Sequence, residues 1–186
     1  MLDLPSPAEP LTDGAVALRE WRDEDADAMV AMLNDDDIAR WTRVPSPYEP
    51  HHATEFFTRV RRQRALGEGI SFAIVAAHDG ELLGSMDLRV ISWEHLRGEI
   101  GYLVGARARG RGVAPQAVRL LSRWGLSEVG LGRISILVDP RNSASQRVAE
   151  KAGYTREGLL RSYSTMNEER VDMVSFSLVP ADLRPW

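Results

Sequence analysis

The segment that most constrains this sequence is a run of glycines and arginines at residues 107–114, Arg-Ala-Arg-Gly-Arg-Gly-Val-Ala. Residues 97–104 before it have the pattern of a β-strand, and residues 113–126 after it place apolar side chains at helical spacing. Glycines let backbone N–H groups approach a ligand, and a helix N-terminus carries unpaired donors with a partial positive charge. Phosphate is the natural ligand of such a loop, although a glycine turn that only joins strand to helix would show the same residues.

The rest of the hydrophobic pattern predicts a mixed order of strands and helices. Strands are expected near residues 15–21, 71–77, 82–90, 97–104, 133–138, 154–160 and 170–178, and an Asp-Gly pair at residues 79–80 predicts a hairpin. Helices are expected from residues 22, 53, 113 and 143, with an irregular proline-rich segment around residues 45–50. We therefore expect a loose lead-in at residues 1–14, a single α/β (α+β) domain with a mixed sheet at residues 15–180, and a tail at residues 181–186.

The composition removes several classes of protein. The 186 residues include no cysteine, which excludes disulfides, thiolate zinc sites and a cysteine nucleophile. No apolar run approaches the ~20 residues that span a bilayer, so we expect a cytoplasmic protein with no membrane partner. The net charge of −4 argues against a nucleic-acid partner. Two common nucleotide-binding motifs do not fit the loop. A Walker loop requires lysine directly after its last glycine, but Gly112 is followed by Val113. A dinucleotide-binding fingerprint requires a third glycine at position 115, which is proline here.

Three motifs that follow one another along the chain, at residues 99–102, 107–112 and 139–158, carry a family resemblance. Residues 107–112 have the form Arg-x-x-Gly-x-Gly/Ala, residues 99–102 read Glu-Ile-Gly-Tyr, and residues 139–158 contain Asn-x-x-Ser, then Glu-Lys-x-Gly-Tyr, then Glu-Gly. Together they resemble the Gcn5-related N-acetyltransferase (GNAT) superfamily, in particular its RimJ/RimL type, which acetylates the N-termini of ribosomal proteins. The resemblance implies one GNAT-like domain with a mixed, mostly antiparallel, seven-stranded sheet, helices on both faces and splayed central strands.

The resemblance also implies acetyl-CoA as cofactor and acetyl donor. By analogy, the pyrophosphate lies on the loop, and the pantetheine arm pairs with the strand before it, where the sheet splays open after Tyr102. Asn142 either binds the pantetheine region or caps the helix that follows. The expected cofactor-binding residues are Tyr102, Leu103, Val104, Arg107, Arg109, Gly110, Arg111, Gly112, Val113, Ala114, Asn142 and Ser145.

The catalytic groups are expected to be Glu99 and Ser145. An ammonium group must lose a proton before its nitrogen attacks a thioester, and Glu99 is the first candidate for that base. Weaker candidates are Asp87, Glu94, His51, His52 and His95. The resemblance places Ser145 near the CoA sulfur, while Ala149 stands where many relatives carry a tyrosine acid. Because cysteine is absent, transfer must be direct.

The acceptor site is expected between residues 35–48 and the last strand pair. Candidate substrate-binding residues are Trp41, Tyr48 and Trp93. The acidic run at residues 35–37 could attract a cationic amine or form a solvated loop, and its spacing does not fit a calcium loop, so no metal is expected. The acceptor itself remains open between a protein N-terminal α-amine and a small amine such as an antibiotic, polyamine or amino acid. A non-catalytic acyl-CoA-binding module is a further alternative, and the chain is expected to be a monomer or homodimer.

Overall fold

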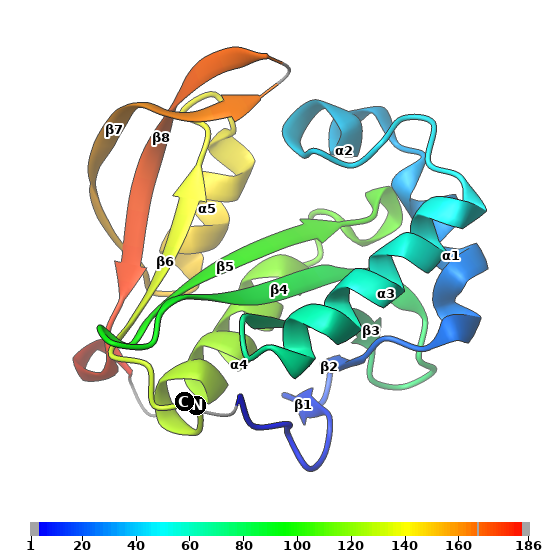
Figure 1. The fold of residues 1–186 in the computed structure, drawn as a ribbon, viewed down its shortest axis with the longest axis horizontal. Helices are drawn as coiled ribbons and strands as arrows, with labels where there is room; N and C mark the ends of the chain where they lie inside the picture. Colours follow the sequence, from blue (N-terminus) through cyan, green and yellow to red (C-terminus); the bar gives the residue numbers. More distant parts are fainter. Residues whose placement is uncertain (1–3, 167, 184–186) are drawn as a thin grey trace.

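The computed structural model describes residues 4–166 and 168–183, which form one sheet flanked by helices (Figure 1). The sheet has eight strands in the order β1-β2-β3-β4-β5-β6-β8-β7. The strands are β1 Leu11–Thr12, β2 Val16–Glu20, β3 Gly69–Ala76, β4 Leu82–Ser92, β5 Arg97–Val104, β6 Arg133–Val138, β7 Thr155–Met166 and β8 Glu169–Leu178. The helices are α1 Ala26–Leu33, α2 Asp36–Trp41, α3 Pro50–Ala65, α4 Val113–Ser127 and α5 Ser143–Lys151.

The two central strands splay apart. All neighbouring pairs in the sheet are antiparallel except β5 and β6, which run parallel and pair only from Arg97–Arg133 to Glu99–Ser135. The opening therefore begins after Glu99, three residues earlier than the expected point at Tyr102. Residues 100–104 remain paired to β4 on one side and, among the described residues, have no strand on the other. This arrangement leaves a free backbone edge in the middle of the sheet.

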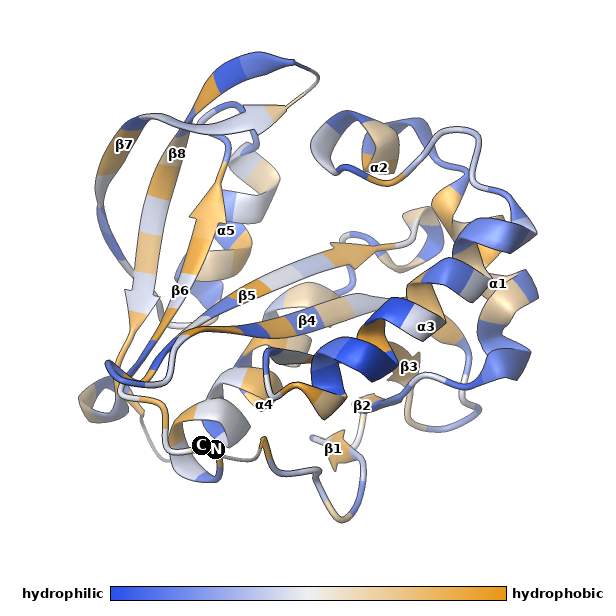
Figure 2. Cartoon of the chain, viewed as in Figure 1, coloured by the Kyte–Doolittle hydropathy of each residue, from blue (hydrophilic) through white to orange (hydrophobic). Residues whose placement is uncertain are grey.

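Helices cover both faces of the sheet, as expected. The apolar stripe of α4 packs on one face, where Val118 and Leu121 are fully buried and Trp124 meets Phe72 edge-on at 6.0 Å between ring centroids. On the other face, α1 and α3 form a second cluster with Met29 and residues such as Leu33 and Phe57. Figure 2 shows that apolar residues are concentrated on the strands and on the helix sides that face them. Burial of these stripes is the main stabilising term of the fold.

Two expectations about the first half of the chain were wrong. The lead-in is not loose throughout, because Leu4 is buried in the core and β1 pairs with β2, which raises the strand number from seven to eight. The acidic run at residues 35–37 is not a solvated loop, because it begins a helix. The Asp35 carboxylate accepts a hydrogen bond from the Ile38 N–H and caps the additional short helix α2. The tail also differs in part, because residues 180–182 form a 3-10 turn. No helix in the described ranges is long and apolar enough to cross a membrane.

Candidate active site

The glycine-rich loop leaves a set of backbone donors unpaired at the start of α4. Gly110 and Gly112 adopt left-handed conformations with φ of +75° and +81°, which glycine accepts without strain. Their geometry turns the chain from β5 into α4. Within the described residues, five consecutive backbone N–H groups have no acceptor, those of Gly110, Arg111, Gly112, Val113 and Ala114. Such a nest at a helix N-terminus can hold an anion.

Arg109 has a different role from the one expected. Its backbone N–H donates to the Ala106 carbonyl at 3.3 Å, so this donor is already used. Its guanidinium donates to the carboxylates of Asp35 and Asp37 and, through Nε, to the Val104 carbonyl at 3.2 Å. The acidic run therefore holds the loop against α2. The side chains of Arg107 and Arg111 are exposed beside the same loop.

A tyrosine–serine pair joins β5, beside the opening between β5 and β6, to the first turn of α5. The hydroxyl of Tyr102 lies 2.8 Å from Ser145 Oγ and donates to the Ser145 carbonyl at 3.2 Å. Burial raises the pKa of Tyr102 to about 12, so the phenol stays protonated at neutral pH. The sequence predicted a role for the Ser145 hydroxyl, but for Tyr102 it predicted only backbone pairing with the pantetheine arm. The contact between the two hydroxyls was missed because no local pattern predicts a contact between residues 43 positions apart.

Asn142 caps α5, which is one of its two expected roles. Its Oδ1 accepts a hydrogen bond from the Ser145 N–H at 2.9 Å. This bond fixes the first turn of α5 beside the opening. The same bond uses only the side-chain oxygen, and the amide nitrogen remains available for a ligand.

Two carboxylates lie on one face of the central strands. Glu99 on β5 forms an ion pair with Arg89, its cross-strand neighbour on β4. Asp87 lies two residues from Arg89 on β4, opposite Gly101. The other candidate bases are placed differently. Glu94 and His95 belong to the turn between β4 and β5, and His51 and His52 interact with Glu49 at the start of α3.

The predicted acceptor walls do not come together. Trp41, at the end of α2, lines a hollow of about 180 Å³ with Arg40, Arg141, Met166, Glu169 and Val171. Tyr48 is only 5% exposed and packs in the core near Met29, so its side chain is a core residue and not a wall of the hollow. Trp93 lies in the turn at the far end of β4 and β5 and donates to the Gly67 carbonyl. Only Trp41 therefore faces the expected acceptor side.

Hydrogen bonds join the segment after α2 to strand β7. The guanidinium of Arg43, just after α2, donates to Ser164 Oγ at 2.9 Å and to the Thr165 carbonyl at 3.1 Å on β7. Figure 1 shows α2 opposite the tip of the β7–β8 hairpin. The acceptor side is thus framed by α2, the hairpin and the opening between β5 and β6.

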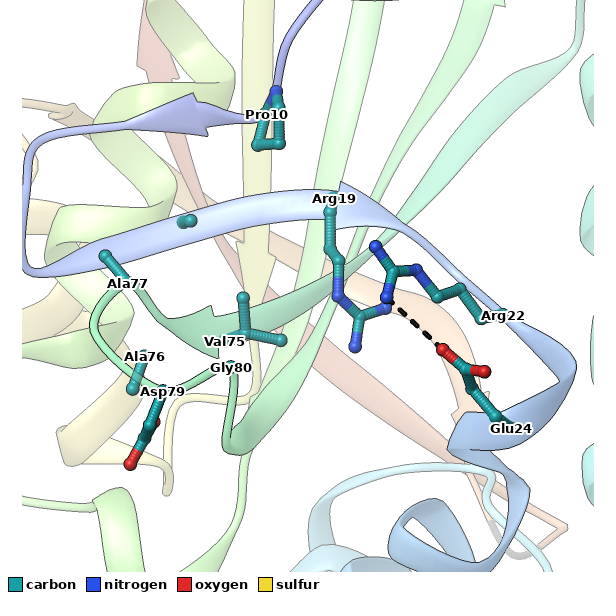
Figure 3. Close-up of a pocket in the computed structure, with 10 residues that line it drawn as sticks. Pro10, Arg19, Arg22, Glu24, Val75, Ala76, Ala77, Asp79 and Gly80 are labelled. Atoms are coloured by element: carbon teal, nitrogen blue, oxygen red, sulfur yellow. Dashed lines mark hydrogen bonds and ion pairs between the residues drawn. The ribbon is translucent and has the colours of Figure 1, made fainter.

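A larger hollow of about 400 Å³ lies elsewhere, at the end of β2 and β3 (Figure 3). Its charged side chains already have partners: Arg19 pairs with Asp25, Arg22 with Glu24, and Asp79 with His78. It shares no residue with the glycine-rich loop or with the Tyr102–Ser145 pair. Among the described residues, no group of three or more histidines, aspartates or glutamates could hold a metal ion.

Comparison with known proteins gives the family. The acetyltransferase (GNAT) domain family matches residues 16–155. An uncharacterized N-acetyltransferase of Bacillus licheniformis, p20, is 28% identical over 171 residues, covering 92% of this chain and 96% of that protein. Spermidine N(1)-acetyltransferase of Escherichia coli K12 is 29% identical over 82 residues, 44% of each chain. The structure of Mycobacterium smegmatis RimJ with CoA-disulfide has a similar fold, with a TM-score of 0.81 at 24% identity, over 95% of this chain and 88% of that one. The chain therefore belongs to the GNAT family and is an N-acetyltransferase that uses acetyl-CoA as its donor.

Proposed function

We propose that the acceptor is the N-terminal α-amine of a protein. The observation that supports this choice is the mixed charge of the acceptor hollow, which is lined by Arg40, Arg141 and Glu169. A polyamine carries several positive charges, whereas the hollow offers it one carboxylate, that of Glu169, beside Arg40 and the Asp139-paired Arg141. A protein N-terminus carries one positive charge followed by backbone carbonyls, which arginine side chains can bind. The similarity in fold to RimJ agrees with this assignment.

We assign the CoA pyrophosphate to the loop, on the five unpaired N–H groups of residues 110–114. Arg107 and Arg111 add positive charge beside it. The pantetheine arm would lie along the free edge of Tyr102, Leu103 and Val104, which no strand covers. The amide nitrogen of Asn142 would donate to this arm. The thioester would then reach the opening beside Ser145.

The residues around the opening suggest a direct transfer. Glu99 would take one proton from the ammonium, using the carboxylate oxygen that Arg89 does not hold. The amine nitrogen would then attack the thioester carbonyl, with the backbone N–H of Tyr102 on the free edge of β5 binding the oxyanion. As the carbon–sulfur bond breaks, the thiolate would take a proton from Ser145, whose hydroxyl is bonded to Tyr102. The second proton of the amine leaves to solvent, Glu99 releases its proton to solvent, and Ser145 regains a proton from solvent, so the reaction balances with the net release of one proton.

A thiol-release assay tests this function. The enzyme would be given acetyl-CoA with either short peptides that carry a free N-terminus or spermidine, and free CoA would be measured. We expect acetylation of peptides and no turnover of spermidine. Turnover of spermidine in preference to every peptide would overturn the assignment and establish a small amine as the acceptor. Glu99→Gln should lower kcat for the peptide, most strongly at low pH, while the Kd for CoA is unchanged; an unaffected rate would remove Glu99 as the base.

A further inference from the structure

A row of side chains leads from the end of β2 to Asp87. The indole Nε1–H of Trp21, just after β2, donates to Ser71 Oγ on β3 at 3.2 Å. Ser71 is the cross-strand neighbour of Asp87 on β4, and its hydroxyl lies beside the Asp87 carboxyl, whose pKa it lowers against the larger effect of burial. The row uses a tryptophan and a serine to hold one carboxylate in place. Both act as positioning residues.

The carboxylate at the end of this row has an unfilled oxygen. Oδ1 of Asp87 is buried and has no hydrogen-bond partner within the described part of the chain. Removing a carboxylate oxygen from water without a donor destabilises the folded protein, and unmatched groups of this kind are rare in native structures. Burial accordingly raises the pKa of Asp87 above its ordinary value. A buried carboxylate oxygen that is retained at this cost in folding free energy is typical of a site in which a bound ligand supplies the hydrogen-bond donor.

The structure leaves space for that donor next to the carboxylate. Asp87 lies directly opposite Gly101 on β5. A Cβ atom built on Gly101 would meet nothing within 4 Å, so the face beside Asp87 is open at this point. Gly101 also lies beyond Glu99, in the part of β5 that has left β6. A ligand in the central opening can therefore reach Asp87 over the glycine.

The local charge sets the kind of donor. Asp87 and Glu99 contribute two negative charges to this face, and Arg89 contributes one positive charge that is already paired with Glu99. Arg59 on α3 is the other cation that acts on Asp87, and its guanidinium stacks over the Phe56 ring at 5.2 Å from the ring centroid. These charges balance, but neither guanidinium donates a hydrogen bond to Oδ1 of Asp87 within the described part of the chain. Because the unpartnered oxygen belongs to a carboxylate, a positively charged donor such as a primary ammonium group fits it best.

We propose that Asp87 binds the amino group of the acceptor, with its Oδ1 accepting a hydrogen bond from the ammonium over Gly101. The inference rests on the proposed function, since it gives that reaction its amine-binding residue. Glu99 would remove the proton, and Asp87 would hold the nitrogen next to the thioester.

The kinetic test compares Asp87→Asn with the matched variant Glu99→Gln, one carboxylate on each strand. Asn keeps the size of the side chain and an oxygen for Ser71, but loses the charge. We expect Asp87→Asn to raise the KM for the peptide roughly 10- to 100-fold, with the Kd for CoA unchanged. Glu99→Gln should instead act mainly on kcat. A peptide KM for Asp87→Asn within threefold of the wild-type value would overturn the proposal.

The stability of Asp87→Asn separates this role from a structural one. Below the unfolded-state pKa the carboxyl is neutral in both states and has no effect on stability. As the pH rises towards the higher folded-state pKa, the unfolded chain ionises first, so the folded protein loses stability, and the loss is complete above the folded pKa. At pH 8 we therefore expect Asp87→Asn to be at least as stable to urea as the wild type while its acceptor KM is raised. A less stable variant with an unchanged KM would make Asp87 a purely structural residue.

A direct measurement keeps this test independent of the acceptor. The carboxyl resonance of Asp87, in protein labelled with ¹³C-aspartate, would be followed while methylammonium is added as a minimal probe. We expect a saturable shift in the wild type and in Glu99→Gln. No response of this resonance would overturn the proposal, whichever amine the enzyme acetylates. A response together with no peptide turnover would refute only the protein N-terminus as acceptor.

Discussion

Replacing Gly110 by alanine isolates the phosphate-binding role of the loop. Gly110 has φ of +75°, and a Cβ atom there would meet nothing within 4 Å in the protein. The substitution therefore causes no clash in the free chain. Its only intramolecular cost is the left-handed backbone, about 1–2 kcal/mol for an L-residue.

Gly80 provides the matched control. It has φ of +78° and equally open surroundings, but lies in the hairpin between β3 and β4. Gly80→Ala and Gly110→Ala should each lower the melting temperature by roughly 2–8 °C, since 1 kcal/mol corresponds to about 2–4 °C in a chain of this size. Comparable shifts in a thermal unfolding experiment would show that the two variants carry the same backbone strain.

Only Gly110→Ala should affect CoA. The new methyl group would occupy space beside the five unpaired N–H groups, and hydrogen bonds of this kind to a charged group contribute about 1.5–3 kcal/mol each. Loss of one bond weakens binding roughly 10- to 150-fold, which isothermal titration calorimetry with CoA measures directly. If Gly110→Ala binds CoA as tightly as Gly80→Ala, the pyrophosphate does not lie on this loop.

Three further substitutions test the site and the fold. Gly112→Asp puts a carboxylate beside the same donors and should abolish CoA binding in calorimetry, so near wild-type affinity would contradict the loop assignment. Tyr102→Phe removes the hydroxyl bonded to Ser145 and should lower kcat at least roughly tenfold at unchanged CoA affinity; equal kcat would leave the pair a structural role. Arg133 and two serines lower the pKa of Glu157 to about 2, so its stabilising effect is present above the unfolded pKa near 4.5 and is lost as the pH falls towards 2. Glu157→Gln should therefore cost up to about 1 kcal/mol in urea unfolding at pH 7 and less at pH 3, and an equal cost at both would refute the ionic contribution.

Sequence reasoning located the order of the elements closely. Strands β5 and β6 begin and end where the alternating pattern predicted, and the helix after the glycines begins at Val113. These elements carry their own periodicity, so local sequence is sufficient. The short helix α2 and the strand β1 were missed, because each is stabilised by distant contacts, such as Arg109 with Asp35, rather than by its own pattern.

The candidate site divides in the same way. The glycine loop and the capping Asn142 depend on backbone geometry within a few residues, and the motifs predicted both. The Tyr102 hydroxyl on Ser145 and the ammonium site at Asp87 depend on side chains brought together from separate strands and helices. The sequence could offer Asp87 only as a weaker candidate base.

The sequence by itself determined that this chain is a cysteine-free α/β domain of the GNAT type with a glycine-rich loop between a strand and a helix. Those features follow from residue type and local spacing. Only the tertiary structure decided where the sheet opens, which residues cross the opening, and which carboxylate lacks a donor. Burial and strand register set these properties, and both emerge only when segments far apart in the sequence pack together.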